Sequence, residues 1–230
     1  MSGNDPEAVL FDLDGTLLDT APDFARVLNC MLLEMDMPAL PYARIRATVS
    51  HGARALVQIA FGLKDGEPGF EPLRTRLLSL YEDGLSVETA PFAGIRGLLE
   101  GFAARGIAWG VVTNKPHYLA EPLMAAMGFV PEPAVLVCPD HVSRTKPDPE
   151  PLLLACRELG YAPEAVVYVG DHARDIEAGR RAGMRTVAAA WGYLAEGESP
   201  LAWGADRIAQ DVTELERFLL EWAQTRETRA

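Results

Sequence analysis

The sequence has little cysteine and no long apolar run. Its only cysteines are Cys30, Cys138 and Cys156, which are odd in number and widely separated. They lack the paired spacing of a zinc site or a disulfide framework, so we expect packed thiols in a reducing compartment. No apolar stretch approaches the ~20 residues that a membrane-spanning helix needs, and residues 1–5 do not start an export signal. These absences predict a soluble, unexported, cytoplasmic protein with no membrane partner.

Basic residues are also in deficit. The chain carries 21 Lys and Arg against 33 Asp and Glu, for a formal net charge of −12. Nucleic-acid binding depends on clustered basic side chains that neutralise phosphates, so a nucleic-acid partner is disfavoured. If the substrate is anionic, its charge must be neutralised locally, by a metal ion, a positioned basic side chain or a helix N-terminus.

Hydrophobic residues make up 49% of the 230 residues, enough for one full core or a core with a smaller appended unit. Three apolar runs end abruptly in polar residues: 8–11 before 12–16, 107–112 before 113–114, and 165–169 before 170–171. Helix-period segments at 95–105 and 149–159 separate them. Buried strands that alternate with helices predict an α/β fold, a three-layer Rossmann-like parallel sheet whose carboxyl edge collects the polar strand ends.

This alternation stops between residues 20 and 91, where apolar residues recur with helical period near 24–35, 53–61 and 72–81. An all-helical insertion placed directly after a polar loop is suited to act as a lid. We therefore predict a catalytic α/β core of residues 1–19 and 92–230 and a helical cap of residues 20–91. The ~30 residues between Thr113 and Lys146 suffice for one helix-and-strand unit, so no second cap is expected there.

Carboxylates gather at two of the predicted strand ends. Asp12 and Asp14 follow the first strand, and Asp171 follows the third. Buried carboxylates repel one another unless a cation holds them together, and oxygen ligands favour Mg²⁺. Asp12, Asp14 and Asp171 are therefore candidate Mg²⁺ ligands. Asp175, one helical turn beyond Asp171, is a candidate to hold the metal ligands in place without being one of them. The alternative is an ordinary negative charge at a helix N-terminus.

Four segments resemble the ordered motifs of the haloacid dehalogenase superfamily. They are residues 12–16 (DLDGT), 113–114 (TN), 146–147 (KP) and 170–175 (GDHARD), and together they cover nearly the whole chain. Residues 112–116 (VTNKP) and 138–142 (CPDHV) resemble, more narrowly, the phosphoglycolate phosphatase-like branch and especially its N-acetylmuramic acid 6-phosphate phosphatases. The resemblance implies a helical cap of the type inserted between the first two motifs, called C1.

The resemblance also implies a role for each motif residue. Asp12 attacks phosphorus, while Asp14 protonates the leaving alkoxide, then deprotonates the attacking water, and reaches Mg²⁺ through its backbone carbonyl. The Thr113 hydroxyl and the amide of Asn114 hold the transferring phosphoryl oxygens, and Lys146 places a positive charge beside them. Taken singly, each residue has a plainer explanation, such as a helix cap, a turn or a surface lysine. Their occurrence as an ordered set favours the catalytic one.

The activity implied is that of a phosphoric monoester hydrolase that uses Mg²⁺ and an aspartyl-phosphate to cleave a small phosphorylated metabolite. N-acetylmuramic acid 6-phosphate, from the recycling of cell-wall sugars, is the first candidate substrate and 2-phosphoglycolate the second. A phosphosugar mutase of the same superfamily remains an alternative within enzymes. Outside enzymes, a phospho-accepting receiver module is disfavoured, because it needs neither the acid at Asp14 nor a helical lid. A monomer and a homodimer are both compatible with the sequence.

The cap segment 50–54 is predicted to choose the substrate, since the core motifs contact only phosphate, metal and the reacting oxygen. Gly52 allows a tight turn ahead of a helix, and Arg54 lies in the first turn of that helix, where a basic residue is electrostatically disfavoured. Arg54 fits a solvated helix residue and a carboxylate ligand equally well, and the resemblance favours the ligand, because caps of this type reach the active site through such a loop. Both candidate substrates carry a carboxylate. His172 departs from the small or acidic residue usual after the fourth-motif Asp, and we assign it no catalytic role.

Overall fold

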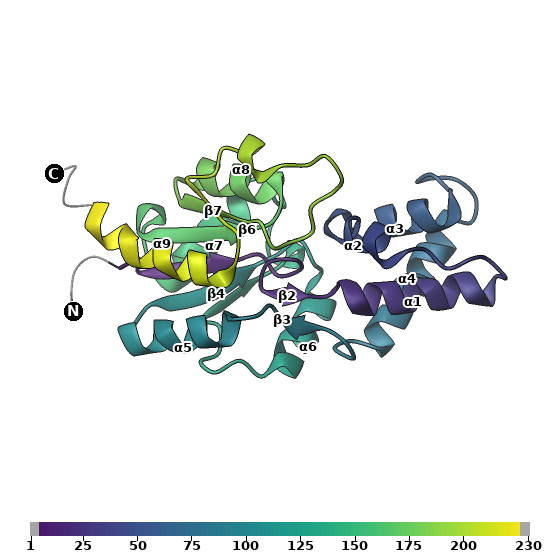
Figure 1. The fold of residues 1–230 in the computed structure, drawn as a ribbon, viewed down its shortest axis with the longest axis horizontal. Coiled ribbons are helices and arrows are strands. Elements are labelled where there is room, and N and C mark those ends of the chain that lie inside the picture. The colour runs from purple at the N-terminus through teal and green to yellow at the C-terminus, as the bar shows by residue number, and fades with distance from the viewer. Residues whose placement is uncertain (1–4, 226–230) are drawn as a thin grey trace.

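The computed structural model describes residues 5–225 as a parallel sheet covered by helices on both faces, with a second group of helices to one side (Figure 1). The sheet has six strands in the order β5-β4-β1-β6-β7-β8, and every neighbouring pair is parallel. The strands are β1 (Ala8–Phe11), β4 (Ala108–Val112), β5 (Val135–Val137), β6 (Val166–Gly170), β7 (Arg185–Ala189) and β8 (Arg207–Ala209). The predicted three-layer α/β architecture is confirmed.

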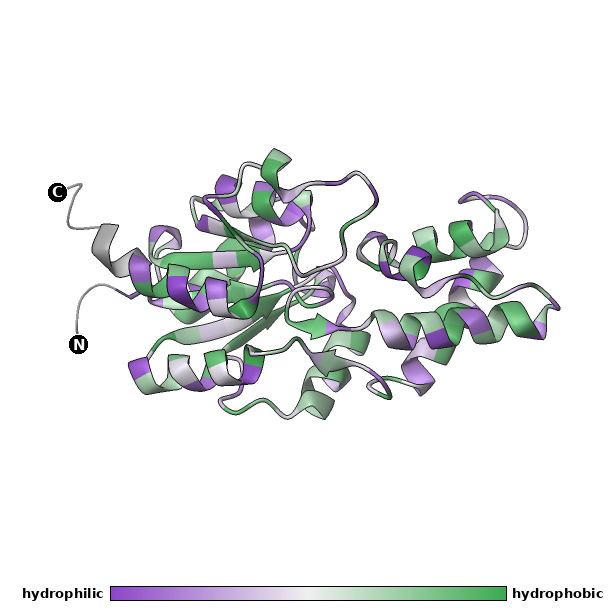
Figure 2. Cartoon of the chain, viewed as in Figure 1, coloured by the Kyte–Doolittle hydropathy of each residue, from purple (hydrophilic) through white to green (hydrophobic). Residues whose placement is uncertain are grey.

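Helices bury both faces of the sheet, so β1 reads as an unbroken apolar run rather than an alternating one. Val9 and Phe11 pack in one core with α5, α6 and α9, whereas Ala8 and Leu10 pack in another with α7 and α8. In Figure 2 most of the sheet is coloured as hydrophobic, whereas the helices beside it carry both hydrophobic and hydrophilic residues. These helices are α5 (Ile95–Arg105), α6 (His117–Met127), α7 (Glu150–Leu159), α8 (Ala173–Ala182) and α9 (Val212–Thr225).

The second group of helices, called here the helical cap, is inserted between β1 and β4. It contains α1 (Ala21–Glu34), α2 (Tyr42–Arg46), α3 (Gly52–Phe61) and α4 (Phe70–Asp83). Its own apolar core includes Leu28, Leu56 and Leu77. A two-stranded antiparallel sheet of β2 (Leu18–Asp19) and β3 (Ala90–Pro91) joins it to the main sheet (Figure 1).

Short 3₁₀ turns complete the described elements at Val49–His51, Pro139–His141, Pro163–Ala165 and Pro200–Ala202. The division at residues 19–20 and 91–92 stays a prediction, and its outer limits, residues 1 and 230, lie outside the described residues. The expectation of three packed thiols is wrong for Cys30, which is exposed on α1, whereas Cys138 and Cys156 are buried. Within residues 5–225, no helix combines the length and apolarity that crossing a membrane requires.

Gly110 lets β4 lie close to β5, which positions the polar residues that follow β4. A Cβ at this glycine would lie 2.4 Å from Val135 Cγ1 and 2.8 Å from the Val135 carbonyl oxygen. Because the second of these atoms is backbone, Gly110→Ala should lower the free energy of unfolding by ~1–3 kcal/mol, as overpacking does.

The matched control is Gly97→Ala on α5, where a new Cβ would meet no atom within 4 Å. It should instead raise the free energy of unfolding by ~0.5–1 kcal/mol, because alanine favours the helix. Urea denaturation measures both values. Equal effects of the two substitutions would contradict the packing assigned to Gly110.

Candidate active site

Polar residues that are distant in sequence meet at the carboxyl edge of the sheet. Asp12 follows β1, and its backbone N–H donates to the Val169 carbonyl at 2.9 Å. Asp171 follows β6, while Thr113 follows β4 and its N–H donates to the Val137 carbonyl at 2.9 Å. The main-chain ladder thus extends past the strands and fixes where these side chains start.

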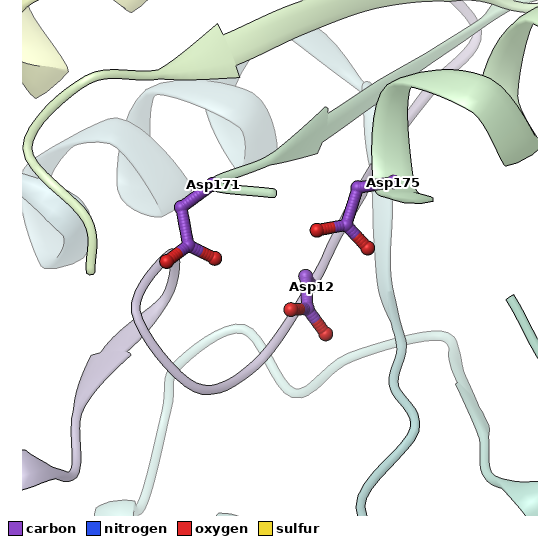
Figure 3. Close-up of side chains that lie close together, drawn as sticks. All are labelled: Asp12, Asp171 and Asp175. Carbon is purple, nitrogen blue, oxygen red and sulfur yellow. The ribbon is translucent and has the colours of Figure 1, made fainter. Parts of the chain in front are cut away.

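Asp12, Asp171 and Asp175 form a buried acidic trio, with one carboxylate oxygen of each within 4.8 Å of the others. Figure 3 shows the three carboxylates facing a common space. Burial raises the pKa of Asp171 to about 8, and the charges of Asp12 and Asp175 act in the same direction. Burial also raises the pKa of Asp12, although Lys146 opposes that effect. Clustered, desolvated carboxylate oxygens are the donors that a Mg²⁺ ion would stabilise, so the trio fits this cation.

Asp171 is held by the loop that follows Asp12. Its Oδ1 accepts a 3.0 Å hydrogen bond from the Thr16 hydroxyl, and its Oδ2 accepts one of 2.8 Å from the Tyr193 N–H. Gly15 has φ +87°, and a Cβ there would lie 2.2 Å from Asp171 Oδ2. Glycine is therefore required for the first motif to lie against the fourth.

Lys146 neutralises part of the negative charge of the trio. Its Nζ lies 2.9 Å from Asp12 Oδ1 and 2.7 Å from Asp175 Oδ1. It also donates to the Val112 carbonyl at 2.9 Å and to the Tyr168 hydroxyl at 2.6 Å. Burial alone would lower the pKa of Lys146, but the two carboxylates raise it above its ordinary value. The lysine is thus a buried cation and not a surface residue.

Asp175 contacts both the buried lysine and the backbone at the start of α8. Besides Lys146, its carboxylate accepts a 3.1 Å hydrogen bond from the His172 N–H at the start of α8. It therefore joins the trio and pairs directly with the buried lysine. Whether it contacts a metal directly or supports the other ligands stays a prediction.

Thr113 and Asn114 line the same cavity as Asp12 and Lys146. The side-chain amide of Asn114 donates to the Lys146 carbonyl at 3.0 Å, and its oxygen accepts from the Lys146 N–H at 3.2 Å. These two bonds tie the second motif to the third. The side chain of Asn114 is thereby engaged with Lys146, and its contact with a phosphoryl oxygen stays a prediction.

The carboxylate of Asp14 is not part of the acidic trio. Its Oδ1 accepts hydrogen bonds from the Thr20 hydroxyl at 2.6 Å and from Lys115 Nζ at 2.9 Å. Sequence reasoning missed Lys115, although it stands inside the segment 112–116 that carries the closer family resemblance. Its type and its place next to Thr113 and Asn114 were the available signals.

The cavity has a volume of about 350 Å³ and lies between the core motifs and the cap. The cap contributes residues 49–54, with Arg74 and Leu78 from α4. Arg54 lines the cavity, and its half-exposed guanidinium pairs with Asp65 and, at 3.1 Å, with Glu71. Its contact with a substrate carboxylate stays a prediction.

The cap loop rests against the fourth motif. The Ser50 hydroxyl lies 3.4 Å from Asp171 Oδ2, and Arg174 donates to the Ser50 carbonyl. The rings of His51 and His172 lie 5.3 Å apart. His172 is half-buried, and its Nδ1 accepts a 3.2 Å hydrogen bond from the Arg174 N–H, so His172 is the N-cap residue of helix α8. Burial holds the pKa of His172 down at about 4.

Tyr193 connects the core to the start of the cap. Its hydroxyl accepts from the backbone N–H groups of Thr20 at 2.6 Å and Ala21 at 2.9 Å, and it donates to Asp19 at 2.7 Å. The same residue holds Asp171 through its backbone N–H. The guanidinium of Arg46, on α2, lies 4.9 Å from the centre of the Tyr193 ring. The N-terminus of α1 and the acidic trio therefore share one anchor.

Known proteins resemble the chain along most of its length. The family model described as haloacid dehalogenase-like hydrolase matches residues 9–189. An N-acetylmuramic acid 6-phosphate phosphatase from Pseudomonas aeruginosa is 50% identical over 209 residues, which cover 91% of this chain and 92% of the relative. A phosphoglycolate phosphatase from Xanthomonas campestris is 43% identical over 210 residues, covering 91% and 95%.

Solved structures agree with this likeness. A "predicted phosphoglycolate phosphatase" from Haemophilus somnus superimposes with a TM-score of 0.81 and 26% identity, covering 92% of this chain and 97% of that one. The family match spans all four motifs that build the carboxyl edge of the sheet. The chain therefore belongs to the haloacid dehalogenase-like hydrolase family.

Proposed function

We propose that the chain is a Mg²⁺-dependent phosphatase that hydrolyses a small phosphate monoester through an aspartyl-phosphate on Asp12. The observation that carries this proposal is the convergence, on one cavity, of a candidate nucleophile, a candidate acid and base, and a buried lysine. Asp12, Asp14 and Lys146 all line this cavity. Thr113 and Asn114 line it too, and they are the groups proposed to hold the phosphoryl oxygens. The high identity to phosphatases supports the same activity.

The chemistry follows from these positions. An oxygen of Asp12 attacks phosphorus, the bond from phosphorus to the ester oxygen breaks, and Asp14 gives that oxygen a proton. In the second step Asp14 takes a proton from water as the water attacks the aspartyl-phosphate, which frees Asp12. Lys146, Thr113 and the Asn114 amide stabilise the charge on the transferring group. Bound Mg²⁺ would be held by Asp12, Asp171 and the backbone carbonyl of Asp14, with Asp175 behind them, and would offset the repulsion between Asp12 and the phosphate.

N-acetylmuramic acid 6-phosphate is the proposed substrate, and 2-phosphoglycolate is the second candidate. Relatives at 50% and 47% identity are named for the first compound, and one at 43% identity is named for the second. A cavity of about 350 Å³ suits a phosphosugar, since cavities for small molecules start near ~300 Å³. The proposal places the enzyme in the cytoplasmic recycling of cell-wall sugars. Residues 20–91 would be the lid that admits this substrate and excludes bulk water.

The two acids of the first motif should fail differently. Asp12→Asn should have essentially no turnover, because no aspartyl-phosphate can form. Asp14→Asn should lose ~10²–10⁴-fold in kcat on a sugar phosphate, the usual contribution of general acid–base catalysis. Phosphate release with Mg²⁺ present measures both. Substantial turnover by Asp12→Asn would remove the proposed mechanism.

Mg²⁺ should stabilise the fold more as pH rises. The pKa of Asp171 is about 8 in the folded state, against an ordinary value of 3.8. Between these values the metal-free folded protein binds the proton more tightly than the unfolded chain, so the contribution of Asp171 to stability falls as pH rises from about 4 to about 8. Mg²⁺ needs the ionised carboxylate and should reverse that loss. Melting temperatures with and without Mg²⁺ should therefore differ more at pH 8 than at pH 5.5.

Asp171→Asn is the control for this titration, because the amide cannot ionise. Its Mg²⁺-dependent shift should be small and should not vary with pH. A shift in the unsubstituted protein that is equally large at both pH values would show that proton displacement at Asp171 does not govern Mg²⁺ binding.

Arg54 should act on specificity and not on the chemical step. Its ion pairs with Asp65 and Glu71 support this role, because the guanidinium already donates to carboxylates that a substrate carboxylate could replace. Arg54→Ala should lower kcat/KM for N-acetylmuramic acid 6-phosphate at least about tenfold, or ~1.4 kcal/mol, and leave p-nitrophenyl phosphate nearly unchanged.

The matched control is Arg76→Ala, which removes an exposed cap arginine that pairs with Glu34 and does not line the cavity. It should leave both substrates unaffected. If Arg54→Ala slows both substrates equally, the arginine supports cap folding or closure and does not select the substrate.

A further inference from the structure

A second buried lysine, Lys115, stands beside the proposed acid and base. Its side chain is 4% exposed, and its Nζ lies 2.9 Å from Asp14 Oδ1 and 3.0 Å from the Tyr81 hydroxyl. Burial would lower the pKa of Lys115, but the charge of Asp14 and the Tyr81 hydroxyl raise it above its ordinary value. Lys115 is thus a charged ammonium group for which the catalytic scheme above has no use.

The bonds to Asp14 all fall on one oxygen. Lys115 and the Thr20 hydroxyl, at 2.6 Å, both donate to Oδ1. Within residues 5–225, Oδ2 receives no hydrogen bond, and Asp14 lines the cavity with its side chain 18% exposed. Two donors on Oδ1 fix the rotation of the carboxylate and leave Oδ2 for the transfer of a proton.

Lys115 also contacts residues of the cap. Tyr81 comes from α4 and Phe24 from α1, and their rings stack with centroids 3.9 Å apart and planes within 3°. Nζ lies 4.6 Å from the Tyr81 ring and 5.1 Å from the Phe24 ring, within the range of cation–π contacts. A core lysine is therefore seated on an aromatic pair of the cap while it holds a core carboxylate.

We propose that Lys115 is a positioning residue that orients Asp14 for proton transfer when the Phe24–Tyr81 pair of the cap is in place. The proposal rests on the proposed function of this site. It assigns the cap a part in the proton transfer as well as in substrate choice. The competing role, a direct contact of Lys115 with the substrate phosphate, is an outcome of the test below.

The two chemical steps need Asp14 differently when the leaving group is p-nitrophenolate. This group leaves as an anion, so formation of the aspartyl-phosphate needs no proton from Asp14. Hydrolysis of the aspartyl-phosphate still needs Asp14 to accept a proton from water, whatever the original ester. Loss of Asp14 orientation should therefore slow the second step and spare the first.

The test is rapid mixing of the Mg²⁺-loaded enzyme with p-nitrophenyl phosphate. Lys115→Met, which removes the ammonium group and keeps most of the unbranched apolar side chain, should release a burst of one p-nitrophenolate per enzyme at the rate of the unsubstituted protein. Steady-state turnover should then be at least about tenfold slower, a fraction of the usual contribution of general acid–base catalysis. Tyr81→Phe keeps the stacked ring and removes only the hydroxyl, so it should show a smaller effect of the same kind.

Lys64→Met, in an exposed cap loop, is the control and should behave like the unsubstituted protein. If Lys115→Met lowers the burst rate and the steady-state rate equally, the lysine binds phosphate or serves folding, and the proposal is wrong. Unchanged kinetics in both Lys115→Met and Tyr81→Phe would also overturn it. Failure of the proposed function is separate, since turnover would then survive Asp12→Asn.

Discussion

Three carboxylates share one buried space at the end of the sheet, and their mutual repulsion is the constraint on which the site depends. Lys146 brings a single ammonium group, which bonds Asp12 and Asp175, and no ion pair within residues 5–225 involves Asp171. Burial is the largest cause of the raised pKa of Asp171, and the charges of Asp12 and Asp175 raise it further. A divalent cation would offset the negative charge of the trio and would also admit an anionic phosphate to an acidic protein. With such a cation bound, the same arrangement would stabilise the clustered carboxylates and attract an anionic ligand.

The parallel sheet supplies the geometry that this charge cluster needs. Adjacent strands β4, β1 and β6 all end at one edge, so Thr113, Asp12 and Asp171 start from neighbouring backbone positions. Hydrogen bonds that continue the ladder beyond β1 and β4 reduce the freedom of these loops. Main-chain pairing thus fixes where the side chains of Asp12 and Thr113 begin.

The sequence was sufficient for those parts of the fold that depend on local patterns. The strands at β1, β4 and β6 are uninterrupted apolar runs, and α5 has a clear helical period, so all four were predicted within a residue or two. The short strands β5 and β8 have three residues each, too few for any period to be recognised. The motif residues were found by their order, and the structure brings Asp12, Thr113 and Lys146 to one cavity. Contacts across the cap, such as those of Lys115 with Tyr81 and of Tyr193 with Thr20, join residues far apart in sequence and leave no local signal.

The ribbon of β2 and β3 brings the two ends of the cap together, because Leu18 pairs with Pro91 and Asp19 with Ala90. The whole insertion thus leaves and re-enters the core at adjacent points and does not enter the six-stranded sheet. Such a junction allows the sequence of the cap to evolve separately from that of the core. Cap residues that do not contact Lys115 or the fourth motif can diverge without altering strand register, so one phosphoryl-transfer core can be reused for new metabolites.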